Sequence, residues 1–336
     1  MVKKLSVFTL IAMLLVLGTG CGNDSKSSKE SKSSEKWSFE LSDQDLKSAR
    51  SQFKTKIVDT SFVPDGKPAV PPTNIFSLVH YPAKDGKMAA YLTSDPKDGK
   101  KHPAVIWIHG GYGGIGEWFW EPQTQDNDQS GKALRDAGIV MMVPSFRGEN
   151  DNPGNYEMFY GELDDLESAY EYLSSLPYVD SSRIYLMGHS TGGTTVLLGN
   201  EYSNKFRAAF SLGGVPDLKL RIKAGKMMVA IPFDQTNTQE FRLRSPRIFL
   251  TSIQSPTFYF EGERAYWPEF DELNKIARAQ NIPFNSYKIK SGGDHFNIIH
   301  PVTLLVAKKI LADTNEKVNI QFSKEDIQWI ENNIYK

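Results

Sequence analysis

The sequence has a single cysteine among 336 residues, so no disulfide can form within the chain and its stability must come from a buried core. Charge is balanced, with 39 Lys and Arg against 40 Asp and Glu, which gives no field that would attract nucleic acid. No repeat of fixed period is apparent, which argues against a solenoid or propeller. H-E-x-x-H, Walker and paired-cysteine motifs are also missing, and we therefore expect neither a metal site nor a cofactor.

The first residues have the pattern of a secretory signal. Lys3 and Lys4 precede an apolar run over 5–17, followed by small residues up to Cys21. The apolar run is too short to span a bilayer permanently. The stretch resembles the lipobox of bacterial lipoproteins, although Gly18 stands where lipoboxes usually have leucine. The resemblance implies a signal peptide over 1–20, lipidation of Cys21 and a lipid anchor on the extracytoplasmic face of the cell membrane.

The remaining chain divides by composition. Residues 21–40 are mostly Ser, Lys, Glu and Asp, and such a segment cannot bury enough apolar surface to offset the entropy of ordering it. It is typical of a flexible tether. We interpret 41–336 as one domain, with 217–247, which shows no clear period, as a candidate cap.

Apolar runs and amphipathic stretches alternate through this domain. The expected strands cover 76–81, 88–93, 104–109, 139–144, 183–188, 208–212, 257–262 and 284–289. The first two predict an antiparallel hairpin, and the continuous apolar runs are typical of strands covered on both faces. Helices are expected over 160–176, 301–311 and the C-terminal 322–336. The order predicts an α/β fold, with a mostly parallel eight-stranded sheet and helices on both faces.

Ser190 lies in YLMGHSTGG, a G-x-S-x-G motif over 188–192. This motif arises by chance in about one chain of this length in ten, so its surroundings must decide. A buried strand ends directly before it and a helix follows, which is the setting of a nucleophile elbow. The tight turn requires glycines at 188 and 192 and lifts the serine oxygen to the N-terminal end of the helix. Ser190 is therefore the predicted nucleophile.

A serine hydroxyl needs a base, expected on a loop after the last strand. His295 lies there, whereas His300 would sit at a helix start, and the side chain of His189 should point away into packing. An acid should orient the base. Glu261 and Glu263 are both candidates, with Glu261 slightly favoured because it ends a strand.

The oxyanion of an acyl-transfer intermediate needs backbone donors. We expect one from Thr191, directly after the nucleophile, and the other from Gly111 or Tyr112 in the HGGYGG loop. The same loop contains G-x-G-x-x-G over 111–116, but no helix opens at its third glycine and no acid ends the next strand. These differences argue against a dinucleotide site.

Taken together, these segments resemble the catalytic domain of the prolyl oligopeptidase family of α/β-hydrolases over about 75–313. WIHGGYGG, VPSFRGENDNPGNY, YGELDDLESAYEYLSSLPYVDSSRIYLMGHSTGG and GGDHF carry the resemblance. It implies that Ser190 and His295 are nucleophile and base. The chain departs from the family in having Thr191 where tyrosine is usual and Ala265 at the position of the aspartate, so Glu261, Glu263 and Asp217 remain candidates for the acid.

These features predict a serine hydrolase that cleaves a small ester through an acyl-enzyme intermediate. Peptidases of this family carry an N-terminal propeller, and too few residues precede the hairpin here to form one. Cleavage of short peptides is the alternative within the same chemistry, and Arg147 or Arg264 could bind a peptide carboxylate. A binding lipoprotein that kept the fold without catalysis is the alternative from another class. The aromatic residues Trp118, Phe119, Trp120, Tyr156, Phe159 and Tyr160 line a pocket or pack in the core.

Overall fold

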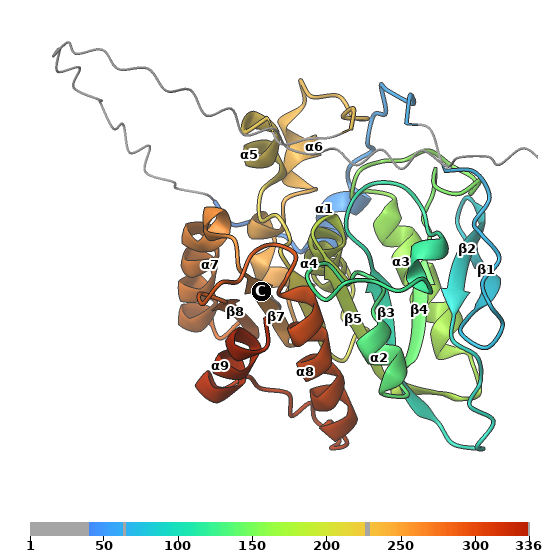
Figure 1. Cartoon of the computed structure of the whole chain (residues 1–336). Helices are drawn as coiled ribbons and strands as arrows, with labels where there is room; N and C mark the ends of the chain where they lie inside the picture. The colour runs from blue at the N-terminus through green and yellow to red at the C-terminus, as the bar shows by residue number, and fades with distance from the viewer. Residues whose placement is uncertain (1–39, 63–64, 226–228, 335–336) are drawn as a thin grey trace, which may run out of the picture. The chain divides into compact units, whose positions relative to one another are not determined.

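A computed structural model describes residues 40–62, 65–225 and 229–334 of the chain. The predictions for 1–20, for Cys21 and for the tether up to residue 39 lie outside these residues. The described chain forms one compact unit (Figure 1). Within it, no helix combines the length and apolar character that crossing a membrane would need.

An eight-stranded sheet forms the centre of the molecule, with strand order β1-β2-β4-β3-β5-β6-β7-β8. The strands β1 and β2 pair antiparallel as a hairpin, β2 pairs antiparallel with β4, and all further pairs are parallel. The bounds are β1 Ser77–Ala83, β2 Gly86–Leu92, β3 His102–Ile108, β4 Val140–Pro144, β5 Val179–His189, β6 Ala209–Leu212, β7 Thr257–Glu261 and β8 Phe284–Lys288. All eight expected strands are present, and the predicted fold class is confirmed.

Helices cover both faces of the sheet (Figure 1). On one face α2 (Lys132–Asp136), α8 (Ile299–Ala312) and α9 (Lys324–Asn332) pack against one another. On the other face α3 (Glu162–Ser174) and α4 (Thr191–Tyr202) pack on the central strands, and α7 (Trp267–Gln280) packs on β8. Alternate residues of one strand divide between these layers, as Val105 and Ile106 of β3 do, because successive side chains point to opposite faces.

The region 217–247 contains two short helices, α5 (Leu218–Lys223) and α6 (Thr238–Arg242). Asp217 caps α5 by accepting a hydrogen bond from the N–H of Leu220. The segment that precedes the sheet also reaches this region, because Ile57 forms an isolated antiparallel bridge with Phe233. That segment begins with α1 (Leu46–Ser51), a helix that the sequence analysis did not predict. An apolar cluster joins residues from α1, α4, α5 and α6.

Candidate active site

Ser190 occupies the turn between β5 and α4 and has φ 55° and ψ −115°. This backbone conformation is costly for a residue with a side chain and persists only where the surroundings enforce it. The N–H of Ser190 donates to the carbonyl of Leu212 at 2.7 Å, and its own carbonyl accepts from the N–H of Thr194 at 3.0 Å. The serine is thus fixed on both sides, at the C-terminal edge of the central strand.

Two glycines allow the turn to be this tight. A Cβ atom at position 192 would lie 2.2 Å from the carbonyl oxygen of Ile108, and one at 188 would lie 2.6 Å from the same atom. Neither distance is sterically allowed, and the contacted atom belongs to the backbone of the neighbouring strand β3. The glycines of G-x-S-x-G are therefore needed for close packing of β3, β5 and α4.

His295 lies on the loop between β8 and α8, on the same side of the sheet as Ser190. Its ring contacts the turn after β6, since a Cβ atom at Gly213 would lie 2.5 Å from the Cε1 atom of His295. Ser190 bonds to Leu212 in that same turn. The structure therefore brings the predicted nucleophile and the predicted base to one turn, although they are 105 residues apart in the sequence.

Glu261 is the acid that the structure places beside His295. Its Oε2 atom lies 3.5 Å from Nδ1 of His295, within ion-pair distance but without hydrogen-bond geometry. Glu261 is fully buried, and its Oε1 atom accepts the N–H of Glu263 at 2.7 Å. Glu263 thus contributes its main chain to holding Glu261, while Asp217 caps α5 and pairs with Arg247.

His189 does not simply pack in the core. It is fully buried, and its Nε2–H donates to the carbonyl oxygen of His295 at 2.7 Å. The two imidazole rings lie 4.7 Å apart. Burial, and then the nearby His295, lower the pKa of His189 to about 3. His189 therefore stays neutral and holds the loop of the predicted base, which is a role that its position next to the serine did not reveal.

Gln129, from the loop before α2, connects this arrangement to the HGGYGG loop. Its Oε1 atom accepts the N–H of Gly110 at 3.0 Å and lies 3.2 Å from Nδ1 of His189. The hydroxyl of Thr191 donates to the carbonyl of Gly111 at 2.6 Å, which ties the start of α4 to the same loop. Main-chain N–H groups in the first turn of a helix have no partner within that helix. The predicted oxyanion donors Thr191, Gly111 and Tyr112 thus lie together.

These residues enclose a cavity of about 160 Å³, which we call the Ser190 cavity. It is lined by Gly110, Gly111, Tyr112, Gln129, Phe159, His189, Ser190, Thr191, Thr194, Val215, Leu218, Arg221 and Phe296. Gln129, Arg221 and Phe296 were not singled out from the sequence, since nothing in their local pattern marks them.

The other residues considered from the sequence lie elsewhere. Arg147 is buried in ion pairs with Asp165, Asp85 and Glu157. Arg264 lies over the ring of Trp267, and His300 pairs with Asp128 at the start of α8. None of these lines the Ser190 cavity.

The aromatic residues divide between the two roles considered for them. Phe159 lines the Ser190 cavity, and Trp118 lines a cavity of about 290 Å³ that shares Gly110, Tyr112 and Gln129 with it. Phe119 is buried in the main core, and Trp120 packs against it. The hydroxyl of Tyr160 donates to the carbonyl of Phe53.

The glycines of G-x-G-x-x-G lead into a three-residue 3₁₀ helix, Glu117–Phe119, and not into an α-helix. The structure thus lacks, at this point, the helix N-terminus that would bind a pyrophosphate. Among the described residues, no three His, Cys, Asp or Glu side chains gather in a way that could hold a metal ion.

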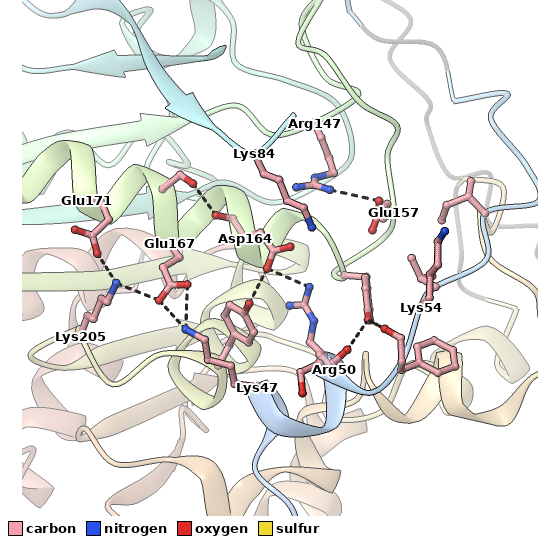
Figure 2. A pocket seen from close by; sticks show the side chains of 17 residues that line it. Lys47, Arg50, Lys54, Lys84, Arg147, Glu157, Asp164, Glu167, Glu171 and Lys205 are labelled. Atoms are coloured by element: carbon pink, nitrogen blue, oxygen red, sulfur yellow. Dashed lines mark hydrogen bonds and ion pairs between the residues drawn. The ribbon is translucent and has the colours of Figure 1, made fainter. Parts of the chain in front are cut away.

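A larger cavity of about 1010 Å³ lies over α1, α3 and α4, and we call it the charged hollow (Figure 2). It is lined by Lys47, Arg50, Ser51, Phe53, Lys54, Thr55, Ile57, Lys84, Arg147, Glu157, Tyr160, Asp164, Glu167, Ser168, Glu171, Tyr202 and Lys205. Its four acids all form ion pairs with its bases, and no histidine is among these lining residues. The serines that line the charged hollow, Ser51 and Ser168, therefore have no histidine among the lining residues that could act as a base.

Known proteins resemble this chain in sequence and in fold. Residues 126–279 match the prolyl oligopeptidase family. An uncharacterized peptidase of Bacillus subtilis, YtmA, is 25% identical over 182 residues, which cover 52% of this chain and 67% of that protein.

Among the solved structures with the same fold, two differ in how much of their length this chain spans. The acylaminoacyl peptidase of Pyrococcus horikoshii has a TM-score of 0.60 at 16% identity, with 76% of this chain and 44% of that chain covered. A hyperthermophilic esterase from Pyrobaculum calidifontis has a TM-score of 0.51 at 15% identity, with 72% of this chain and 86% of that chain covered. The chain therefore spans less than half of the archaeal peptidase but most of the esterase.

Fold and family match together define a class: the protein is a serine hydrolase with the α/β-hydrolase fold. Within that class, its resemblance to the prolyl oligopeptidase family, first seen in the sequence motifs, is confirmed.

Proposed function

We propose that this protein hydrolyses small esters, with Ser190 as nucleophile, His295 as base and Glu261 as the acid that orients the base. The observation that carries this proposal is the strained backbone of Ser190 at the end of β5, beside a cavity that the predicted oxyanion donors also line. The esterase with the same fold supports the choice of esters, since the match covers most of its length.

In this mechanism the oxygen of Ser190 attacks the ester carbonyl while His295 takes its proton. The N–H groups of Thr191 and of Gly111 or Tyr112 bind the resulting oxyanion. His295 then gives the proton to the leaving alcohol, the bond to that alcohol breaks, and an acyl-Ser190 remains. Water attacks the acyl group with His295 again as base, which releases the acid and restores the serine.

Reaction with a fluorophosphonate tests the nucleophile. We expect an adduct at Ser190 in the folded protein and none in Ser190→Ala, which should also lose at least about 10³-fold in ester hydrolysis. Ser211, which is buried at the end of β6, provides a matched control, because Ser211→Ala should keep the adduct. If the folded protein forms no adduct, the alternative of a binding lipoprotein without catalysis is favoured.

Substrate class needs a separate measurement. We expect kcat/KM for a 4-nitrophenyl ester of a short acid to exceed kcat/KM for short peptide 4-nitroanilides by more than the difference in intrinsic reactivity. The relatives named as peptidases support the other outcome, in which the anilides are the better substrates. That outcome would replace the ester by a peptide and leave the roles of Ser190, His295 and Glu261 unchanged.

We further propose that the enzyme works at the outer face of the cell membrane, held by a lipid on Cys21. The signal-like segment over 1–20 supports this. In a bacterial host, Cys21→Ala should move the protein from the membrane fraction to the soluble fraction, while Ser25→Ala should leave it in place. A Cys21→Ala protein that stays with the membranes would contradict the anchor.

A further inference from the structure

The Ser190 cavity contains one permanently charged side chain. Among its lining residues Arg221 is the only arginine, lysine, aspartate or glutamate, and His189 is neutral because it is buried. The other members are glycines, apolar side chains and uncharged polar groups. A lone positive charge in a small, partly apolar cavity favours a negatively charged ligand, since the low dielectric strengthens their attraction.

Arg221 lies in the last turn of α5 and is half-buried. One of its terminal nitrogens donates to the hydroxyl of Tyr266. Burial raises the pKa of Tyr112 and of Tyr266, and in both cases the positive charge of Arg221 opposes this rise. Both tyrosines therefore lie within its field, and Tyr112 shares the cavity with it. A guanidinium with a phenol beside it presents several N–H and O–H groups, and a carboxylate can accept hydrogen bonds from them.

The pairing of Arg221 differs from that of five other arginines. Throughout the described chain, no carboxylate oxygen lies within ion-pair distance of it, while several arginines do have such partners: Arg50, Arg147, Arg207, Arg244 and Arg247. The fold thus neutralises five guanidinium groups internally. Among the described arginines that have no acidic partner, Arg221 is the one that lines the Ser190 cavity. A planar guanidinium binds a carboxylate with two parallel hydrogen bonds, so the missing acid can be supplied by a substrate.

We propose that Arg221 makes the enzyme selective for substrates whose acyl group carries a carboxylate. This rests on the proposed hydrolase function. The acyl group stays attached to Ser190 between the two chemical steps, so an enclosed cavity next to that serine suits it. The volume of about 160 Å³ corresponds to about five water molecules and therefore fits a short chain. Val215, Leu218 and Phe159 contact its methylene groups, while Arg221 binds its far end.

Two sources supply this chemistry: a half-ester of a short dicarboxylic acid, and an acidic amino-acid residue on the acyl side of a peptide or amino-acid ester. They share the carboxylate and differ in the bond that is cleaved. For the first source, kcat/KM is measured for the 4-nitrophenyl monoester of adipic acid and for the ester of 6-methylheptanoic acid, in which an isopropyl group replaces the carboxylate. For the second source, the pair is the 4-nitroanilides of glutamate and leucine.

The full chain in detergent should prefer the charged member of at least one pair. Arg221→Gln should lower the ratio of kcat/KM for charged over uncharged substrate by about ten- to a hundredfold, as expected for a charge-assisted hydrogen bond. Arg221→Lys should restore part of the ratio, because the charge remains but the two-pronged geometry is lost. Lys223→Gln is the matched control: it removes a charge from an exposed position of the same helix and should leave the ratio within about twofold.

A ratio that is equal in the wild type and in Arg221→Gln for both pairs would overturn the proposal while the hydrolase function stands. Failure of the hydrolase function itself appears differently, as absent turnover of all four substrates and no fluorophosphonate adduct. In that case the binding of monomethyl adipate to the Ser190→Ala protein is measured by calorimetry. Binding that is lost in the double variant Ser190→Ala, Arg221→Gln supports the carboxylate site. Absence of binding to Ser190→Ala rejects it. Circular dichroism verifies that each variant is folded. If Arg221→Gln is not folded, Arg221→Lys replaces it in both the kinetic and the calorimetric measurement.

Discussion

The Ser190 cavity and the charged hollow differ in size, in charge and in how their side chains are paired. The first encloses about 160 Å³ and contains one charged side chain, Arg221. The second encloses about 1010 Å³ and is lined by six bases and four acids, with all four acids in ion pairs (Figure 2). Volume alone would point to the charged hollow. We propose the smaller cavity as the site of chemistry, because it is lined by the proposed nucleophile Ser190, by Phe296 next to the proposed base and by Arg221, which has no acidic partner among the described residues.

The proposed acid, Glu261, gives the largest expected effect. Glu261→Gln keeps the shape of the side chain but removes the charge that stabilises the imidazolium of His295, so kcat should fall by about 10²–10⁴-fold. Glu263→Gln is the control, because Glu263 contributes its main-chain N–H to Glu261, and this variant should retain most of the activity. The measurement is kcat for a short 4-nitrophenyl ester. Equal losses in the two variants would contradict Glu261 as the acid.

In the charged hollow, substitutions should instead change stability. Arg147 donates to Asp165 from its backbone N–H, from Nε and from Nη2, and Asp165 is fully buried. Asp165→Asn leaves the guanidinium without its main partner and should lower the free energy of unfolding by about 3–5 kcal/mol. Urea denaturation measures this change. Fluorophosphonate labelling of the protein that remains folded should be unaffected, and a selective loss of labelling would link the hollow to catalysis.

A pH dependence is expected from the Ser190 cavity. The folded-state pKa of His189 is about 3, below the ordinary value of 6.5, so its contribution to stability is fully present above pH 6.5 and is lost as the pH falls toward 3. Between pH 7.5 and 5 this loss amounts to about 2 kcal/mol. In His189→Gln, the amide can still donate to the carbonyl of His295 but does not titrate. The free energy of unfolding should therefore fall by about 2 kcal/mol less between pH 7.5 and 5 than in the wild type. Urea denaturation at the two pH values tests this, and an unchanged difference between them would contradict it.

The smallest effect is expected at the rim of the hollow. Lys47 is mostly exposed and pairs with Glu167 at 3.0 Å, and water screens such a pair. Lys47→Gln should change the free energy of unfolding by at most about 1 kcal/mol in the same denaturation experiment. A loss as large as that of Asp165→Asn would mean that the ion pairs of the hollow act as one network.

Much of this molecule could be predicted from its sequence because its inner strands, such as β3 and β4, are buried on both faces. Apolar runs such as 104–109 and 139–144 identify them without reference to the rest of the chain. Ser190 and His295 follow two of the expected strands, and Glu261 lies at the end of a third. The choice between Glu261 and Glu263 was left open because it depends on which carboxylate turns inward, and pairing of β7 with β8 decides that. Gln129 and Arg221 could not be found, since they act through contacts with loops distant in sequence.

The sequence gives less information about the structure of residues 217–247 and of the segment that precedes the sheet. Residues 217–247 form helices of only five and six residues, which are too short to show a clear period. The bridge between Ile57 and Phe233 joins segments 176 positions apart, and no local pattern indicates such a pair.

Glu261 is the last residue of β7, where it pairs with Lys288 of β8. A carboxylate held by the hydrogen-bond ladder of a sheet keeps its place when the neighbouring turn is rebuilt. If Glu261 is the acid, Glu263 and Arg264 in the following turn are released from that task and can vary as surface loops generally do. Gly262 must stay, because a Cβ atom there would lie 2.5 Å from the main chain of Gly293, and Tyr266 must stay because it contacts Arg221. Substitutions at 263 and 264 are thus a route to new substrate preferences that keeps the proposed acid and the main-chain N–H at 263.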